Sequence, residues 1–241
     1  MTEVIAERDG DTLTLTLNRP DKRNALSPAL VEGLLGYVTA AYEDGTRLLV
    51  LRGAGRNFSA GFDFGDLEEV GDGELLRRFV RIEALLQAVY HAPYDTLALA
   101  HGRNFGAGAD LIAACARRTA APGTTFLLPG LKFGLVLGTR RFAARVGPGP
   151  ARRLLGDGIT FDADQAHDLG FATAVAPRED WPTHVQDVRA AATALDPHAR
   201  ADLHRVATPD TRDADLADLV RSAARPGLKQ RIQHYRNGGP A

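Results

Sequence analysis

Two short apolar runs constrain the fold more than any other feature of this chain. RLLVLRG occupies residues 47–53 and DTLALA occupies 95–100. Short runs without polar alternation are typical of strands that are buried on both faces, as in parallel sheets. Segments of helical periodicity lie before, between and after them, at about 28–42, 74–91 and 107–118. Strands that alternate with helices predict parallel βα units in an α/β layered core.

Further patterns complete the predicted core. Residues 12–17 (TLTLTL) alternate strictly behind a turn at Gly10, which predicts that the chain opens with a β-hairpin. Two later strands are predicted at 124–129 and at 171–175 (FATAV), with a helix at about 138–146 between them.

The C-terminal part of the chain has a different character. After Trp181 no strand pattern occurs. Three helical stretches are predicted there, at 181–195, about 197–206 and 211–236. We therefore expect a layered core over residues 1–178 and a helical region over 179–241.

Composition and charge argue against several classes of partner. The 241 residues are 44% hydrophobic and 24% charged, an ordinary globular balance, and the formal net charge is −1. Because no basic run occurs, neither nucleic acid nor an anionic membrane is expected as a partner. No apolar run reaches the roughly 18 residues that a membrane span requires. The N-terminal sequence is acidic and shows no signal peptide, so we expect a cytoplasmic protein.

The histidines and the cysteine show no metal-site pattern. The seven histidines lack a spacing such as H-x-x-x-H, so no metal is expected. The single cysteine, Cys115, excludes an intramolecular disulfide. It lies in the apolar helical stretch LIAACA, where a small buried hydrophobic residue is expected.

Glycine near the end of a buried strand marks two candidate sites. Asn57-Phe-Ser-Ala-Gly-Phe-Asp63 comes just after the run at 47–53. His101-Gly-Arg-Asn-Phe-Gly-Ala-Gly-Ala-Asp110 comes directly after the run at 95–100. At such positions a backbone without Cβ atoms can approach a ligand closely.

On the residues alone, three interpretations of the second site remain open. Its GAG sequence resembles part of a dinucleotide fingerprint, but G-x-G-x-x-G requires a glycine where Leu111 stands. The glycines also suit a tight strand-to-helix turn with only a packing role. In the third interpretation, the turn presents free N–H groups at a helix N-terminus, where the helix dipole favours an incoming oxygen.

The first site has a rival interpretation as well. Ser59-x-Gly61 resembles half of the nucleophile elbow G-x-S-x-G, but Asn57 replaces the first glycine. Ser59 also lacks a recognisable pair of histidine and acidic partners, which disfavours a serine hydrolase.

Four segments together resemble the signatures of one family. They are NRPDKRNALS at 18–27, FSAGFD at 58–63, HGRNFGAGADL at 101–111 and GDGITFDADQAHDLGFATAV at 156–175. In this order and spacing they are similar to the crotonase, or enoyl-CoA hydratase/isomerase, superfamily. The resemblance implies repeated ββα units with two roughly perpendicular sheets, and a C-terminal helical region that forms homotrimers, often dimers of trimers. It also implies an acyl-CoA thioester as ligand, with no cofactor beyond the coenzyme A of the substrate.

Carried over residue by residue, the resemblance implies an oxyanion hole built from two backbone N–H groups. The first donor is the amide of Phe62, which follows the glycine of the Ser-Ala-Gly motif. The second donor is the amide of Ala107, the middle residue of Gly106-Ala107-Gly108. Two such amides stabilise the negative charge of a thioester enolate.

The resemblance also implies that coenzyme A runs along two segments near the first site. The residues expected to contact it are Lys22, Arg23, Ala25, Leu26, Ser59, Ala60, Gly61 and Asp63. Lys22 or Arg23 would meet phosphate groups, although either is equally an ordinary solvated cation.

The acid–base residues depart from the pattern of the family's hydratases, which use two glutamates. The first position matches Asp110, three residues after Ala107 and so on the same face of the helix. Aspartate occurs there in the dienoyl-CoA isomerase branch, although an acidic residue also suits the first turn of a helix without any catalytic role. The second position falls on Gly130, which puts hydration of the two-glutamate kind in question.

Glu83 is the candidate for a second catalytic acid. It projects within the apolar arc of the predicted helix at 74–91. This is close in register to the helix that supplies a catalytic histidine in the dehalogenase branch. Burial raises the pKa of a carboxyl group toward a catalytically useful range. The alternative is an ion pair with Arg140 or Arg141.

The combined prediction is an enzyme of the enoyl-CoA hydratase/isomerase type that works through a thioester enolate. Two alternatives remain: another crotonase reaction, such as C–C or thioester cleavage, and a CoA-thioester-binding protein without efficient catalysis. Gly130 motivates the second alternative.

Overall fold

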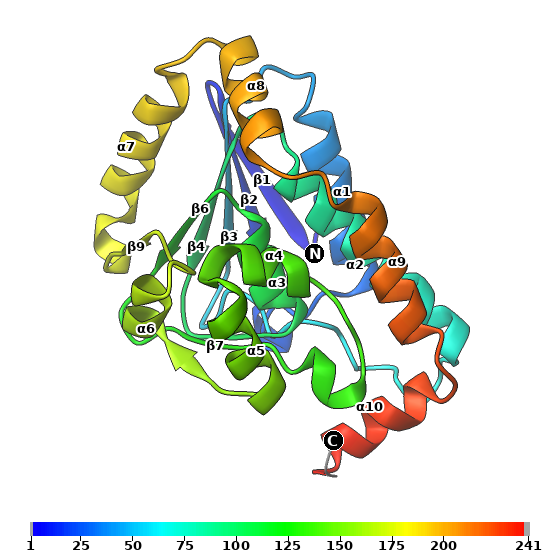
Figure 1. Ribbon diagram of the computed structural model, residues 1–241. Coiled ribbons are helices and arrows are strands. Elements are labelled where there is room, and N and C mark those ends of the chain that lie inside the picture. Colours follow the sequence, from blue (N-terminus) through cyan, green and yellow to red (C-terminus); the bar gives the residue numbers. More distant parts are fainter. Residues whose placement is uncertain (1, 239–241) are drawn as a thin grey trace.

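Two sheets form the framework of the molecule. The computed structural model describes residues 2–238. Its larger sheet, with the strand order β1-β2-β3-β4-β6-β9, stands at the centre of Figure 1. The strands are β1 (Val4–Asp9), β2 (Thr12–Leu17), β3 (Leu48–Gly53), β4 (Asp95–Ala100), β6 (Arg117–Ala120) and β9 (Ala174–Val175). β1 and β2 form the predicted antiparallel hairpin, and every other pair of neighbours in this sheet is parallel.

The smaller sheet begins where the chain leaves β4. Its strands are β5 (Arg103–Phe105), β7 (Thr125–Leu127) and β8 (Phe161–Asp162), with β7 in the middle. Only His101 and Gly102 separate β4 from β5, so the chain crosses between the sheets within two residues. The second glycine-rich segment therefore runs from one sheet through the other into a helix.

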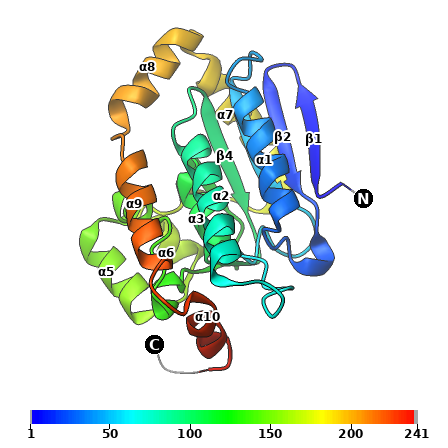
Figure 2. The same ribbon diagram turned by 90° about the vertical axis from the view of Figure 1, so that its right-hand side faces the viewer.

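Helices cover one face of the larger sheet and surround the smaller one. They are α1 (Pro28–Ala40), α2 (Asp72–Tyr90), α3 (Ala107–Ala114), α4 (Thr139–Val146), α5 (Pro148–Asp157) and α6 (Ala163–Asp168), with the 3-10 turns η1 (Pro20–Lys22) and η2 (Gly130–Phe133). α1 and α2 lie side by side in front of the sheet in Figure 2. The Ser27 hydroxyl accepts a hydrogen bond from Leu30 N at 3.1 Å and so caps α1, as expected for Ser-Pro at a helix start.

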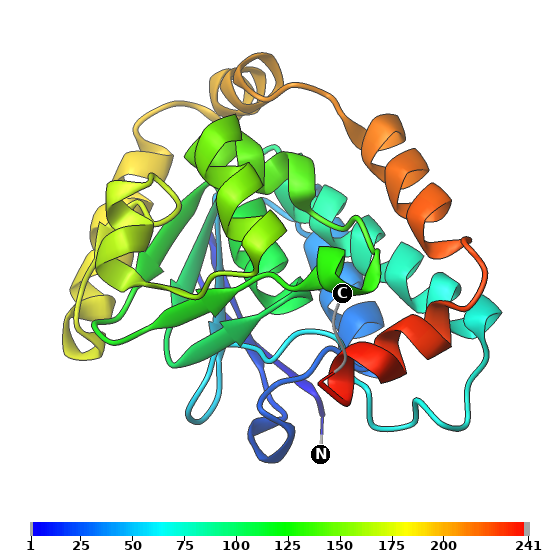
Figure 3. The same ribbon diagram turned by 60° about the horizontal axis from the view of Figure 1, so that its bottom comes forward.

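From β9 to residue 238, the described chain contains helices but no strand. These are η3 (Arg178–Asp180), α7 (Trp181–Thr193), α8 (Pro197–Ala207), α9 (Arg212–Ala223) and α10 (Leu228–Arg236). α7 packs Trp181 and Val188 against Leu48 and Val50, on the sheet face opposite α1 and α2. α8 leads back across the molecule, and α9 and α10 contact α2 on its outer side (Figure 3). The mixed α/β class and the C-terminal helices predicted from the sequence are confirmed.

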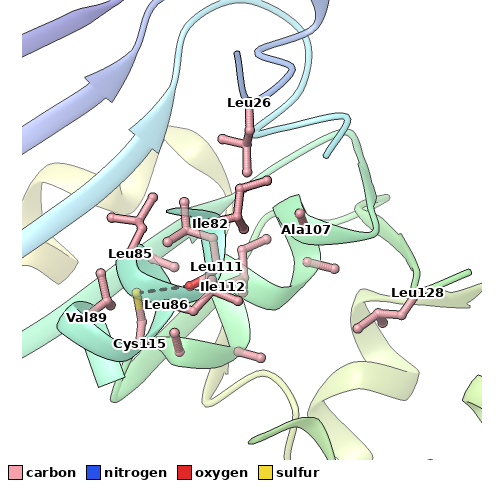
Figure 4. Close-up of a cluster of buried hydrophobic side chains, with 14 of the residues drawn as sticks. Leu26, Ile82, Leu85, Leu86, Val89, Ala107, Leu111, Ile112, Cys115 and Leu128 are labelled. Atoms are coloured by element: carbon pink, nitrogen blue, oxygen red, sulfur yellow. Dashed lines mark hydrogen bonds between the residues drawn. The ribbon is translucent and has the colours of Figure 1, made fainter. Parts of the chain in front are cut away.

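The main core lies between α2, α3 and the sheet. Figure 4 shows part of it, where Leu26 meets side chains of α2 and α3. Cys115 is fully buried here, and its thiol contacts the Leu111 carbonyl oxygen at 3.6 Å. Burial raises the pKa of the Cys115 thiol to about 12. It is therefore a small buried hydrophobic residue, as predicted.

Several elements differ from the sequence prediction, among them the stretch at 211–236, which forms the two helices α9 and α10, and the segments around α3 and α5. The predicted helix at 107–118 ends at Ala114, and the strand β6 begins at Arg117. The cause is tertiary: the buried Arg118 guanidinium donates to the carbonyl oxygens of Cys115, Ala116, Gly170 and Phe171, which holds this segment extended beside β4 and β9. Helix α5 was not predicted, because Gly147-Pro148-Gly149-Pro150 has the composition of a loop, although proline is well suited to a first helical position.

Candidate functional site

One cavity opens between the smaller sheet, α3 and the C-terminal helix α10. Its volume is about 240 Å³. Most lining side chains are apolar, and among the described residues the polar ones are Asp110, Thr139 and Tyr235. The apolar part of the lining is Ala60, Phe62, Phe64, Phe79, Phe105, Ala107, Leu127, Leu128, Pro129, Leu131, Phe133, Leu135, Leu137 and Leu155, with Gly106 and Gly130.

Both glycine-bearing segments reach this cavity, and they meet backbone to backbone. A Cβ atom on Gly61 would lie 2.3 Å from the Phe105 carbonyl oxygen, and Gly61 adopts a φ of +83°. A Cβ atom on Gly108 would lie 2.6 Å from the Ser59 carbonyl oxygen. Both distances are below any contact that a real side chain makes, so glycine is required at each position.

This close approach brings the Phe62 and Ala107 amides to the same end of the cavity. A Cβ atom on Gly61 would be only 3.3 Å from Ala107 N. Ala107 is the first residue of α3, so its N–H has no acceptor within the helix. Within residues 2–238, neither amide donates a hydrogen bond. Two free N–H groups, one of them at the positive end of a helix dipole, suit a ligand that carries a partially negative oxygen.

Ser59 supports this turn rather than facing the cavity. It is fully buried, and its hydroxyl donates to Asn24 O at 2.8 Å and accepts from Gly61 N at 3.1 Å. A hydroxyl that is engaged in both directions is not available as a nucleophile, which argues against the serine hydrolase interpretation.

The segments expected to contact coenzyme A lie side by side. Ala60 N donates to Arg23 O at 2.9 Å, and Leu26 N donates to Gly61 O at 2.7 Å. Ala25 and Leu26 are buried, whereas Lys22 and Arg23 are exposed and have no ion-pair partner within residues 2–238.

Asp63 has a different environment from the exposed cations. Its carboxylate accepts a hydrogen bond from Arg19 Nη1 at 2.7 Å. Asp63 therefore fixes the turn at 58–63 to Arg19, while the side chains of Lys22 and Arg23 remain available to bind an anion.

Asp110 lies in the first turn of α3 and lines the cavity. It is only 3% exposed, and its Oδ1 atom has no hydrogen-bond partner among the described residues. A Cβ atom on Gly138 would lie 2.1 Å from this oxygen, so glycine at 138, with a φ of +64°, makes room for the carboxyl group. Burial raises the pKa of Asp110 well above its usual value of 3.8. The charge of Arg141 opposes this increase in pKa, and the charge of Glu83 adds to it.

Gly130 also lines the cavity, at the start of η2. Its carbonyl oxygen accepts from Leu135 N at 2.9 Å, and a Cβ atom would lie 3.0 Å from the Leu135 carbonyl oxygen. The position thus faces the pocket that contains Asp110 but contributes no side chain.

Glu83 does not line the cavity. It is 1% exposed and forms a two-point ion pair with Arg141, with a further hydrogen bond from Gln87 Nε2 at 2.9 Å. Arg141 also contacts the Asp215 carboxylate at 3.0 Å. Of the two interpretations that the sequence left open for Glu83, the structure shows the ion pair with Arg141, and it does not place the carboxyl group at the cavity as a second catalytic acid would require.

Sequence reasoning missed two residues at this site, Gly138 and Tyr235, and it named Arg141 only as a candidate partner of Glu83 and not for its effect on Asp110. Gly138 makes room for the Asp110 carboxyl group, Arg141 acts on its charge, and Tyr235 reaches the cavity from a distant helix. No local pattern marks them, because each acts through a contact far along the chain. The one available signal was a buried acid on the apolar face of α2, which required a cation from elsewhere.

The fold and the site identify the class of protein. The chain matches the model of the enoyl-CoA hydratase/isomerase family over residues 7–219. It therefore belongs to this family of enzymes, within the crotonase superfamily, as the four sequence segments predicted.

Particular relatives agree with this assignment. A crystal structure from Bordetella parapertussis, described as an enoyl-CoA hydratase/isomerase, is 55% identical, with a TM-score of 0.97, and the match covers 98% of this chain and 99% of that one. The enoyl-CoA isomerase/hydratase fer4 of Mycosarcoma maydis is 32% identical over 68% of this chain and 64% of its own length. The 2,3-dehydroadipyl-CoA hydratase of Escherichia coli is 33% identical over 74% of this chain and 71% of its own.

The part of the chain that the structure describes contains neither a candidate membrane span nor a candidate metal site. No helix between residues 2 and 238 is both long and apolar enough to cross a membrane. No group of three or more His, Cys, Asp or Glu side chains in that part of the chain is placed to hold a metal ion.

The raised pKa of Asp110 predicts a specific dependence of stability on pH. The folded chain keeps a proton on Asp110 at pH values where the unfolded chain has lost it, so this contribution to stability is present at low pH and is lost as the pH rises through the folded-state pKa. Asp110→Asn cannot ionise. We expect the melting temperature of the variant, relative to the wild type, to increase from about pH 5 to about pH 8.

The exposed Asp202 provides the matched control, since it lies on α8 away from the cavity. Asp202→Asn should show a difference from the wild type that stays constant over the same range. A constant difference for Asp110→Asn would contradict the raised pKa.

Proposed function

We propose that the chain binds an acyl-CoA thioester and moves a proton at a carbon next to, or conjugated with, the thioester carbonyl. The observation that supports this most strongly is the combination of two free backbone amides and one buried carboxyl group in a single apolar cavity. Asp110 is the only carboxylic acid among the described residues that line the cavity.

In this proposal the Phe62 and Ala107 amides form the oxyanion hole. Removing a proton next to a thioester places negative charge on the carbonyl oxygen. Amides that are fixed before the reaction stabilise this charge without reorganising, and one such donor is typically worth about 10²–10³ in rate. The apolar lining strengthens the effect, because it excludes water from the charge.

Asp110 serves as the acid and base. A carboxyl group with an ordinary pKa is a weak base near neutral pH, and a raised pKa brings it closer to the optimum. As a carboxylate, Asp110 takes a proton from one carbon of the acyl chain to give the enolate. It then returns a proton, either the same one or one that has exchanged with solvent while on Asp110, to that carbon or to the far end of the conjugated system, so the proton count is unchanged and the double bond can move.

The glycine at 130 favours such proton transfer over efficient hydration. Addition of water requires one group to activate the water and a second to deliver or accept the proton at the α-carbon. With Gly130 in the lining and Glu83 bound to Arg141, the cavity provides one carboxyl group rather than two. The same feature supports the alternative of a CoA-thioester-binding protein without efficient catalysis, which an exchange assay distinguishes.

Coenzyme A would follow the paired segments 22–26 and 59–63, which are hydrogen-bonded to each other beside the two free amides. The exposed Lys22 and Arg23 suit its phosphate groups.

The first test is proton exchange. In deuterated water, we expect the wild type to incorporate deuterium into at least one member of a panel of saturated, enoyl, dienoyl, aromatic and 3-oxo acyl-CoAs, as detected by mass spectrometry. Asp110→Asn should reduce this exchange by about 10²-fold or more, while the affinity for the ester changes only a few-fold. Binding of an ester without any exchange would favour the non-catalytic alternative, and absence of binding to every acyl-CoA would refute the proposal.

The second test concerns position 130. Gly130→Glu should raise the hydration rate of crotonyl-CoA above that of the wild type, because it adds a carboxyl group to the cavity that contains Asp110. Gly130→Ala is the matched control, since it brings the same Cβ atom within 3.0 Å of the Leu135 carbonyl oxygen without a carboxyl group. Efficient hydration by the wild type would show that a second acid is already in place.

We also propose that the chain assembles as a trimer or a dimer of trimers. Leu203 and Val206 on α8, and Leu216 and Val220 on α9, are large apolar residues between 37% and 74% exposed. Apolar side chains on successive helices favour contact with another subunit. Light scattering at micromolar concentration should give three or six times the mass of one chain, and a monomeric mass would contradict this proposal.

A further inference from the structure

Tyr235 brings a polar group to the cavity from the C-terminal helix α10. This helix is held firmly in place within the same chain. The Asp72 carboxylate at the start of α2 accepts hydrogen bonds from the backbone N–H groups of Gly227, Leu228 and Lys229, at 2.8–3.2 Å. Leu228 and Ile232 are fully buried in the main core.

α10 spans two walls of the cavity that come from distant parts of the sequence. The ring of Tyr235 packs against Phe133 in η2, with ring centres 5.5 Å apart, and Arg231 Nε donates to Phe133 O at 3.0 Å. The guanidinium of Arg236 lies over the ring of Phe64, 5.3 Å from its centre. The wall that contains Phe64 comes just after Phe62 in the sequence. The wall that contains Phe133 belongs to η2, which begins at Gly130.

The hydroxyl group of Tyr235 has no hydrogen-bond partner among the described residues, although the residue is half-buried and lines the cavity. Burial raises its pKa, so it stays neutral and is available as a donor. Around it the lining is almost entirely apolar. A ligand that fills the cavity removes water from this hydroxyl, and an unpaired buried donor opposes binding.

We propose that Tyr235 is a specificity-determining residue, whose hydroxyl donates a hydrogen bond to an acceptor on the bound acyl group. The site would thus select acyl-CoA thioesters with an oxygen function in the acyl part over plain hydrocarbon esters of the same size. This inference rests on the proposed function, because it assumes that the cavity receives the acyl group. A site built to pair with a polar group rejects analogues that lack it, since its own donor is then left unpaired.

The experiment compares Tyr235→Phe with the wild type on matched pairs of ligands. Calorimetry gives dissociation constants for octanoyl-CoA against 3-oxooctanoyl-CoA, and for benzoyl-CoA against 4-hydroxybenzoyl-CoA. Tyr37→Phe is the control, because Tyr37 is 43% exposed on α1, outside the cavity lining, and its hydroxyl forms no hydrogen bond with the described residues.

We expect the wild type and Tyr37→Phe to prefer the oxygenated ester of at least one pair by about ten-fold or more. In Tyr235→Phe this preference should fall to within about two-fold, with opposite changes for the two ligands. The oxygenated ester should bind more weakly because the variant lacks the Tyr235 hydroxyl that donates to it. The hydrocarbon ester binds more tightly because no hydroxyl is left unpaired.

The opposite changes separate specificity from a merely structural role. If Tyr235 had only a structural role, Tyr235→Phe would weaken the binding of both esters together, and this result would overturn the inference. An unchanged preference in Tyr235→Phe, or no preference in the wild type for either pair, would overturn it as well. Each of these results still includes binding of acyl-CoA esters, so the proposed function survives it. If no ester binds to the wild type, the proposed function itself fails.

Discussion

The site depends on the contact between two backbones that have no side chains between them. The turn at 58–63 and the segment that leads from β5 into α3 approach so closely that Gly61 and Gly108 cannot carry a Cβ atom. This contact holds the Phe62 and Ala107 amides at one end of the cavity, each without an acceptor among the described residues. Main-chain donors fixed in this way do not depend on a flexible side chain, so their geometry is set as soon as the two sheets are assembled.

Burying Asp110 beside these amides is costly, and a set of charges outside the cavity regulates that cost. A neutral Asp110 avoids most of the penalty for burial, which is why its pKa rises. The charge of Arg141 acts to lower this pKa and the charge of Glu83 acts to raise it, while Glu83 and Asp215 both contact the Arg141 guanidinium. This set of ion pairs also joins α2, α4 and α9, and so connects the C-terminal region to the two helices that pack against α3.

The sequence predicted those parts of the molecule that local patterns specify. The hairpin, the buried strands, most of the helices and the family were all predicted correctly, and the residues expected at the site include two amides and a carboxyl group that the structure brings to one cavity. Predictions failed where tertiary contacts override local preference. Arg118 ends α3 early through carbonyl groups of the segment around 170. For Glu83 the sequence left two roles open, and the structure shows the ion pair with Arg141, 58 residues away.

The C-terminal helices are consequently part of the site rather than an appendage to it. α9 supplies Asp215 to the ion pair behind Asp110, and α10 supplies Tyr235 to the cavity lining. Both helices are secured by polar side chains of α2, since Gln87 donates to Arg212 O and Asp72 accepts from the first amides of α10. A change in how these helices pack, including contact with another subunit, would reach the cavity by two routes at once. One route is electrostatic, through Arg141, and the other is steric, through the ring of Tyr235 against Phe133.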